Sequence, residues 1–136
     1  MSYLLDTNAV IALLNGKPDC VREHYRRAEA SGTYVAVSSI VLFELWYGVA
    51  KSSRPTENAE RLSVFMSGVL DVLSFEDEDA AVSGRVRAEL EASGTPIGAY
   101  DLLIAGQALR HGLTLVTANT SEFDRVRDLR WEDWSR

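Results

Sequence analysis

Short β-rich apolar runs alternate with helical segments along the chain, and this alternation constrains the fold more than any other feature. The sequence predicts strands at residues 3–5, 33–38, 71–75, 113–119 and 129–134. It predicts helices at residues 8–14, 19–30, 39–51, 56–68, 76–92 and 97–112, with Asp19 and Ser39 as N-caps of the second and third. Strands separated by helices require crossover connections. We therefore expect an α/β fold, a three-layer α/β/α sandwich with a small, mainly parallel central sheet.

The length and charge of the chain restrict its class. The 136 residues predict one domain spanning 1–136. Twenty acidic and fourteen basic residues give a net charge of −6, which argues against a general DNA-coating protein but not against an enzyme that gathers acids around a metal ion. The single cysteine, Cys20, allows no internal disulfide, and no apolar run approaches the roughly 20 residues needed to span a bilayer. We expect a cytoplasmic protein without a membrane partner.

Three carboxylates occupy positions that suggest a common site. Asp6 directly follows the first strand, Glu44 lies in the helix after the second strand, and Asp101 lies in the first turn of the helix at 97–112. In parallel α/β sheets, ligands bind just beyond the carboxyl ends of the strands. Asp6 and Asp101 also have a simpler explanation, because an acid stabilises the N-terminus of a helix.

Glu44 is harder to explain as a surface residue. Its neighbours are almost wholly apolar, in the run "SIVLFELWYGVAK", and no face of that helix around Glu44 is clearly solvated. A buried ionised Glu costs several kcal/mol unless it is paired or bound to a metal. A structural Arg partner remains an alternative. Three acids on three separate elements suit Mg²⁺ or Mn²⁺, which prefer oxygen ligands.

Other phosphoryl-transfer families fit the chain less well. A haloacid-dehalogenase-type phosphatase requires a second Asp two residues after the first, and that position is Asn8. A response-regulator receiver requires paired acids after the first strand and a Lys after the last one, and neither is present. The chain also lacks a Gly-rich phosphate loop ending in Gly-Lys.

Four stretches, "LLDTN", "SSIVLFELWYG", "GTPIGAYDLLIA" and "LVTANTSEF", together resemble the PIN domain in their order and spacing. The chain is most similar to the VapC-type ribonuclease toxins of bacterial toxin–antitoxin pairs, over nearly its whole length. The resemblance implies a metal-dependent endoribonuclease with Mg²⁺ or Mn²⁺ bound by Asp6, Glu44 and Asp101. It also implies an RNA substrate, a homodimer and a separate antitoxin protein that blocks the site.

The resemblance assigns supporting roles as well. Thr7 and Asn8 match the first motif of the family, and Thr117 matches the Thr after the fourth strand. The polar residue before the Glu-bearing helix, matched by Ser38 or Ser39, supports the site in this family. The chain departs from the family at the fourth acid, because many PIN domains have Asp where this chain has Asn119. Glu122 is the first candidate to fill that acidic position if the "SEF" turn is helical, and Asp124 is a weaker one.

Candidate RNA-binding cations are Lys51, Arg54, Arg85 and Arg87, although each also fits a solvated helix face or a bridge to an acid. Trp46 and Tyr47 fit a core or an interface better than base stacking. The alternative to an enzyme is a non-catalytic PIN-like module that binds RNA or protein. Asn119 is the only sequence feature that favours it.

Overall fold

The computed structural model describes residues 1–68 and 71–136. It contains a five-stranded sheet with the order β3-β2-β1-β4-β5, in which every neighbouring pair of strands is parallel. The strands are β1 (Tyr3–Leu5), β2 (Val35–Ser38), β3 (Asp71–Leu73), β4 (Thr114–Val116) and β5 (Trp131–Glu132). The expected α/β fold with a small parallel sheet is therefore confirmed, and each strand lies within the stretch that the sequence predicts.

Seven helices connect and cover the strands. They are α1 (Thr7–Asn15), α2 (Asp19–Ala30), α3 (Ser39–Lys51), α4 (Pro55–Met66), α5 (Asp77–Ala92), α6 (Ala99–His111) and the short α7 (Thr120–Phe123). The predicted bounds of α2 and α3 are correct, and those of α1, α4, α5 and α6 are correct to within two residues. Helix α7 confirms that the "SEF" turn is helical.

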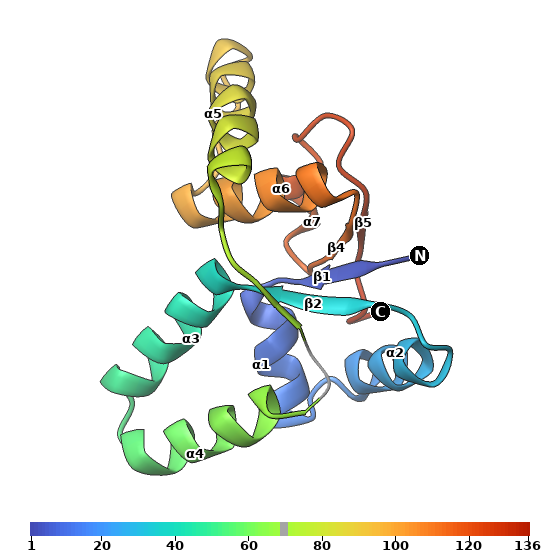
Figure 1. Ribbon diagram of the computed structural model, residues 1–136, viewed down its shortest axis with the longest axis vertical. Coiled ribbons are helices and arrows are strands. Elements are labelled where there is room, and N and C mark those ends of the chain that lie inside the picture. Colours follow the sequence, from blue (N-terminus) through green and yellow to red (C-terminus); the bar gives the residue numbers. More distant parts are fainter. Residues whose placement is uncertain (69–70) are drawn as a thin grey trace.

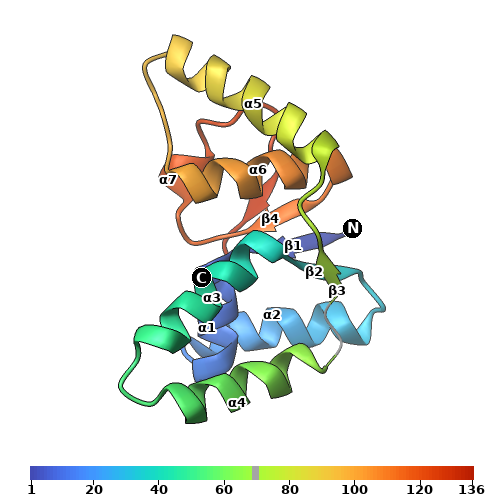
Figure 2. The ribbon, with the colours of Figure 1, turned by 60° about the vertical axis from the view of Figure 1, so that its left-hand side comes forward.

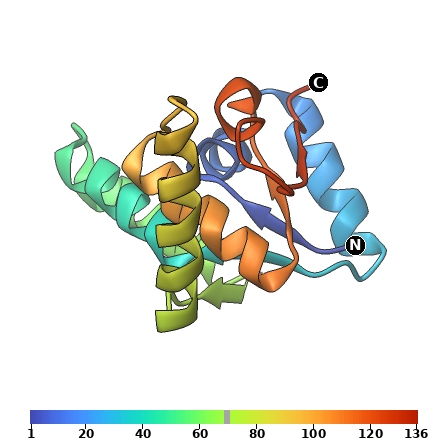
Figure 3. The same ribbon diagram turned by 90° about the horizontal axis from the view of Figure 1, so that it is seen from above.

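The helices form two layers around the sheet (Figures 1 and 2). Helices α1, α2 and α4 lie on one face, and α5 and α6 lie on the other. Helix α3 lies beyond the carboxyl ends of the strands, where it packs against both α1 and α6. In the view from above (Figure 3), α5 crosses over α6, and the C-terminal segment lies beside α2. The three-layer α/β/α arrangement is confirmed.

Burial explains why β1, β2 and β4 form the centre of the sheet. Leu4, Leu5, Ala36, Val37 and Leu115 are fully buried, as expected for strands covered on both faces. The outer strands β3 and β5 are more exposed.

Two predicted helix caps are wrong. Ser38, and not Ser39, caps α3, because the Ser38 hydroxyl accepts a hydrogen bond from the amide of Ile40 at 3.0 Å. Ser39 Oγ instead accepts a hydrogen bond from the amide of Phe75 at 3.0 Å and ties α3 to the segment after β3. Asp19 lies inside the first turn of α2, and the N-cap position belongs to Pro18, whose fixed φ suits the start of a helix. Neighbouring residues of the same type cannot be told apart by capping preference alone.

The strand order locates the site. From β1 the chain runs through β2 to β3 on one side of the sheet and then returns to place β4 and β5 on the other side. The order therefore reverses between β1 and β4, and such a switch point opens a crevice at the carboxyl ends of the strands. Asp6 follows β1 and Thr117 follows β4, so both residues lie at this crevice.

Candidate metal-dependent active site

Asp6 lies at the centre of the switch point and is nearly inaccessible to solvent. Its Oδ1 accepts a hydrogen bond from the amide of Ala9 at 2.8 Å and caps α1, so the capping explanation of Asp6 is confirmed. Burial raises its pKa, and the carboxylates of Glu44 and Asp133 raise it further, while hydrogen bonds from Thr117 and the Ala9 amide lower it in part. The cap engages one carboxylate oxygen, so capping leaves the other oxygen able to bind a cation.

Glu44 is half-buried, and its Oε1 accepts a hydrogen bond from the hydroxyl of Thr7 at 2.7 Å. Its neutral partner is therefore Thr7, a residue of the first motif. The expectation that no face of α3 is solvated is wrong, since the side chains of Phe43, Trp46 and Tyr47 are exposed. These side chains form an aromatic surface beside Glu44, in which Phe43 lies against Tyr100 of α6 with ring centres 5.5 Å apart, while α3 also packs on α1 and α4.

Asp101 lies in the first turn of α6, where Gly98 occupies the N-cap position. It has the most perturbed environment of the acids at the switch point. Burial and the neighbouring carboxylate of Glu122, followed by Asp6 and Glu44, raise the pKa of Asp101 to about 6. The carboxylates of Glu122, Asp6 and Glu44 all lie near enough to Asp101 to raise its pKa.

Glu122 lies beside Asp101 and Asn119. Its Oε1 accepts a hydrogen bond from the Gly98 amide at 2.6 Å, and its Oε2 accepts one from Asn119 Nδ2 at 3.0 Å. These two bonds, together with a hydrogen bond from Asp101, lower the pKa of Glu122 despite its partial burial. Asp101 and Glu122 therefore form a coupled pair, in which Asp101 holds a proton more readily than Glu122 does.

Asn119 and Thr117 connect these acids to the strand β4. The Thr117 hydroxyl accepts a hydrogen bond from the Asn119 amide at 2.9 Å and also contacts the carboxylate of Asp6. The Asn119 side chain lies 3.5 Å from Asp101 Oδ2. Asn119 therefore takes the role of a hydrogen-bond donor between Asp101 and Glu122 and not that of a fourth carboxylate. The neighbouring Asp124 ends α7 and is exposed.

The donor chemistry of the cluster suits a hard divalent cation. Four carboxylates surround the switch point, and the ion pairs in the described part of the chain involve none of them. A neighbouring negative charge raises the pKa of a carboxylate, and a bound divalent cation would offset that effect. Across residues 1–68 and 71–136, however, no three Asp, Glu, His or Cys side chains yet converge closely enough to hold an ion. Each carboxylate instead has at least one oxygen directed to a protein hydrogen-bond donor.

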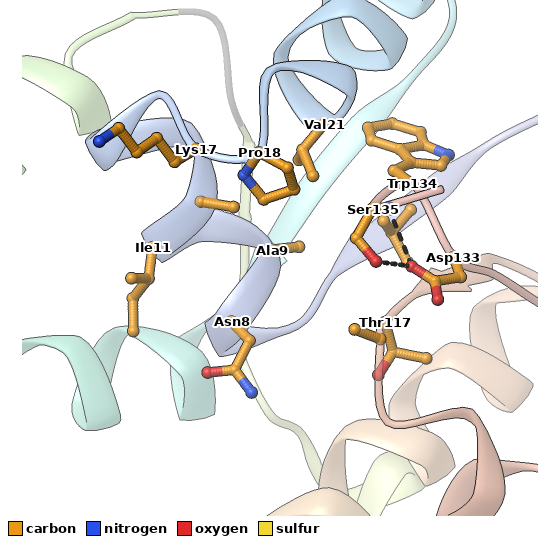
Figure 4. Close-up of a pocket in the computed structure, with 13 residues that line it drawn as sticks. Asn8, Ala9, Ile11, Lys17, Pro18, Val21, Thr117, Asp133, Trp134 and Ser135 are labelled. Atoms are coloured by element: carbon orange, nitrogen blue, oxygen red, sulfur yellow. Dashed lines mark hydrogen bonds between the residues drawn. The ribbon is translucent and has the colours of Figure 1, made fainter.

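Asp133 was not predicted as a site residue, although its charge also raises the pKa of Asp6. It follows β5, which lies beside β4, so its carboxylate reaches the same edge of the sheet. The strand predicted at residues 129–134 included Asp133, and for this reason the rule that ligands gather beyond the carboxyl ends of strands did not select it. The supporting residue Asn8 is exposed at the start of α1, on the wall of a cavity beside the acid cluster (Figure 4).

The candidate RNA-binding cations lie on helix surfaces. Arg54, Arg85 and Arg87 form ion pairs with acids one turn away, at Glu57, Glu89 and Glu91, and all six side chains are more than half exposed. The Lys51 ammonium instead lies 5.0 Å from the centre of the Tyr47 ring. The three arginines therefore bridge to acids, which was the alternative to an RNA-binding role. Of the four candidates, only Lys51 lies beside the aromatic surface of α3.

Comparisons with known proteins agree with this geometry. Residues 3–129 match the model of the PIN domain. The chain is 42% identical over 135 residues to the tRNA(fMet)-specific endonuclease VapC of Shigella flexneri, with 99% of each protein covered. It is 41% identical over the full length of the ribonuclease VapC2 of Rickettsia felis. The crystal structure of VapBC2 from Rickettsia felis bound to a promoter DNA fragment contains a chain that superposes with a TM-score of 0.91 at 40% identity, over 98% of this chain and 99% of that one.

Proposed function

The chain belongs to the PIN-domain family, and we propose that it is a VapC-type endoribonuclease, the toxin of a toxin–antitoxin pair. The observation that carries this proposal is the set of four carboxylates, Asp6, Glu44, Asp101 and Glu122, around the switch point of the sheet. Full-length relatives with about 40% identity that are named VapC endonucleases support it.

The substrate is RNA, and tRNA is the class of RNA to which the names of the relatives point. The relatives from Shigella flexneri and Salmonella typhimurium are both named tRNA(fMet)-specific endonucleases. The chain itself supports an endonuclease, because Glu44 and Asp101 are only half-buried at the switch point. Cleavage leaves a 5′-phosphate and needs no reaction of the 2′-hydroxyl, so preference for RNA comes from its shape and 2′-hydroxyl contacts.

The cofactor is Mg²⁺ or Mn²⁺, held by Asp6, Glu44 and Asp101. When bound, such an ion lowers the pKa of water and polarises a phosphoryl oxygen. Thr7 orients Glu44, and Thr117 orients Asp6. Asn119 holds Glu122 beside Asp101 through its side-chain amide. Lys51 is the candidate contact to an RNA phosphate, because its ammonium has no carboxylate partner among the ion pairs of the described residues.

The partner is an antitoxin protein, and the assembly is built on a homodimer. Solved relatives include VapBC complexes bound to DNA from Rickettsia felis and Salmonella typhimurium. The exposed aromatic surface of α3 supports an interface, since large apolar side chains seldom gather on the free surface of a monomer. No helix in the described part of the chain is both long enough and apolar enough to cross a membrane.

The test is cleavage of a mixed tRNA pool by wild type and by Asp101→Asn, each in Mg²⁺, in Mn²⁺ and in EDTA. We expect wild type to cut only with a divalent ion and to leave 5′-phosphate ends. We expect Asp101→Asn to lose at least about 100-fold in rate, because it removes a ligand from the ion while the amide keeps the volume.

Thermal unfolding of both proteins is the control for folding. If two folded proteins cut equally, or if neither cuts while both bind the RNA without a metal, the cluster is not a nuclease site. The second result would make the chain a non-catalytic binding module.

A further inference from the structure

A separate cavity lies directly beside the acid cluster. It has a volume of about 240 Å³ and lies between α1, the start of α2, the end of β4 and the C-terminal segment. Figure 4 shows Pro18, Val21 and Trp134 at one end of it and Asn8 and Thr117 at the other. Because Thr117 also contacts Asp6, this second end of the cavity adjoins the carboxylates.

The walls of the cavity combine two kinds of surface. Its faces are apolar, made by residues such as Ala9, Pro18 and Val116, while Asn8, Thr117 and Asp133 supply polar groups. A nucleobase has the same division, with apolar faces and hydrogen-bonding edges. The volume lies below the roughly 300–1,000 Å³ of pockets for drug-sized ligands, so the cavity suits one flat ring system.

The polar groups favour one kind of base edge. Asp133 Oδ1 accepts hydrogen bonds from the amide of Ser135, at 2.9 Å, and from its hydroxyl. Its Oδ2 pairs with the exposed Arg136 at 3.2 Å. A carboxylate has about four acceptor sites, so Asp133 keeps capacity to accept another hydrogen bond. Asp133 lies on a wall that also carries Lys17, and its carboxylate favours a group that donates hydrogen bonds.

We propose that this cavity is a base-specificity subsite, which takes the nucleobase next to the cleaved bond and prefers bases with an exocyclic amino group. Adenine, cytosine and guanine carry such a group, and uracil does not. Asn8 lies on the α1 wall at the Thr117 end of the cavity, and none of the hydrogen bonds among the described residues engages its side chain. This inference rests on the proposed endoribonuclease function.

The first arm of the test maps sequence preference. Full-length wild type, Ser135→Phe and the control Ser63→Phe cut a random single-stranded RNA library, and the ends of the products are sequenced. Ser135 lies on the cavity wall near the end of the chain, so a phenyl ring there fills the cavity, whereas Ser63 is exposed on α4. We expect wild type and Ser63→Phe to disfavour uridine at one position beside the cut. We expect Ser135→Phe to lose this preference and about 10-fold in kcat/KM on preferred sequences.

The second arm does not depend on cleavage. Adenosine, cytidine and uridine 5′-monophosphates, and ribose 5-phosphate, are added to ¹⁵N-labelled wild type in EDTA. We expect the first two to shift the signals of the Trp134 indole and the Ser135 amide more than uridine 5′-monophosphate does, and ribose 5-phosphate to leave them unchanged.

The two arms separate the possible failures. If the library is cut with the same base preference by wild type and Ser135→Phe, and no nucleotide shifts these signals, the subsite is wrong and the nuclease stands. If nothing is cut but adenosine and cytidine 5′-monophosphates still shift the signals, the proposed activity is wrong and the base site stands. Shifts caused equally by ribose 5-phosphate would also overturn the subsite.

Discussion

At the scale of single residues, Asp101 departs most from an ordinary surface acid. Its pKa of about 6 arises from burial and then from the carboxylate of Glu122. Because burial and neighbouring carboxylates raise this pKa above the ordinary value for an Asp, ionisation of Asp101 costs folding free energy. Protonated Asp101 therefore makes its full contribution to the stability of the folded, metal-free protein below about pH 4. That contribution is lost as the pH rises through about 6.

The first prediction follows from the raised pKa of Asp101. In EDTA, Asp101→Asn should raise the free energy of unfolding at pH 7 by up to about 1 kcal/mol, a figure reduced because a half-exposed group is screened by solvent. The difference between variant and wild type should be larger at pH 7 than at pH 5. Urea unfolding at both pH values measures it, and a variant less stable than wild type at pH 7 would show that Asp101 is not held among like charges.

Thr7 supports Glu44 and carries the second prediction. Its hydroxyl donates to Glu44 Oε1 at 2.7 Å. Thr7→Val keeps the shape of the side chain and removes the donor, so Glu44 loses its orientation and kcat/KM should fall about 10- to 100-fold, as for other groups that orient metal ligands. Steady-state cleavage at saturating Mn²⁺ measures the change. Thr7→Ser restores the hydroxyl and should recover most of the activity, and a Val variant as active as wild type would contradict the role.

At the scale of elements, the packing of α5 on α6 depends on a single glycine. A Cβ at Gly106 would lie 2.0 Å from Ser83 Oγ and 2.9 Å from the Ser83 Cα, so the two helices touch at this point. This contact holds α6, whose first turn carries Asp101, against the rest of its layer.

The third prediction compares two glycines in these helices. Gly106→Ala should lower the free energy of unfolding by about 2–3 kcal/mol, because the buried Ser83 has no room to move away. Gly84→Ala is the matched control, since nothing lies within 4 Å of its added Cβ. It should raise stability by about 0.5–1 kcal/mol through helix propensity. Urea unfolding of both variants checks the prediction, and equal effects would contradict the close contact.

The elements themselves were largely predictable, because apolar periodicity and Gly or Pro boundaries mark them. The chain ends α1 at Gly16, whose φ of 71° suits glycine, and ends α6 in the same way at Gly112. Caps failed where two candidates adjoin, as at Ser38 and Ser39. The exposure of Phe43 and Tyr47 was also unpredictable, because an apolar helix face that is left for a partner has the same sequence pattern as a buried one.

At the scale of the whole molecule, a chain with a net charge of −6 must bind a polyanion. Cations already committed to acids contribute little, and Arg87 is one of these, since its Nε lies 3.0 Å from Glu91. Lys51 lies over an aromatic ring instead. The positions of these cations in space, and not their number in the sequence, decide which can reach RNA.

The fourth prediction compares Lys51, which lies over an aromatic ring, with Arg87, which is paired with Glu91. In EDTA, Lys51→Gln should weaken binding of single-stranded RNA several-fold and reduce the slope of log K against log salt by about 0.7, the value for one phosphate contact on a single strand. Arg87→Gln carries the same change of charge and should have a smaller effect on both. Fluorescence anisotropy over a range of salt concentrations measures them, and indistinguishable slopes for the two variants would rule out Lys51 as a specific contact.

The site was predictable where topology brings motifs together and not where side chains choose partners. Asp6 and Asp101 were singled out because they follow a strand and begin a helix at the same edge of the sheet, whereas Glu44 was singled out because it interrupts an apolar helix. Glu122 was already the first candidate for the fourth acidic position, but its hydrogen bond from the Gly98 amide and the contact of Asn119 with Asp101 could not be predicted. Asp133 was missed because the strand predicted at 129–134 ran past it, whereas β5 ends at Glu132.

The central claim is that these carboxylates form one site for a divalent ion, and calorimetric titration of Mn²⁺ into the full chain tests it most directly. We predict saturable binding to wild type, with release of protons near pH 6, because Asp101 is partly protonated there and must lose that proton to bind the ion. Asp101→Asn should bind at least about 10-fold more weakly, while Ser63→Phe should match wild type. Equal binding by wild type and Asp101→Asn, or no binding by either folded protein, would contradict the account.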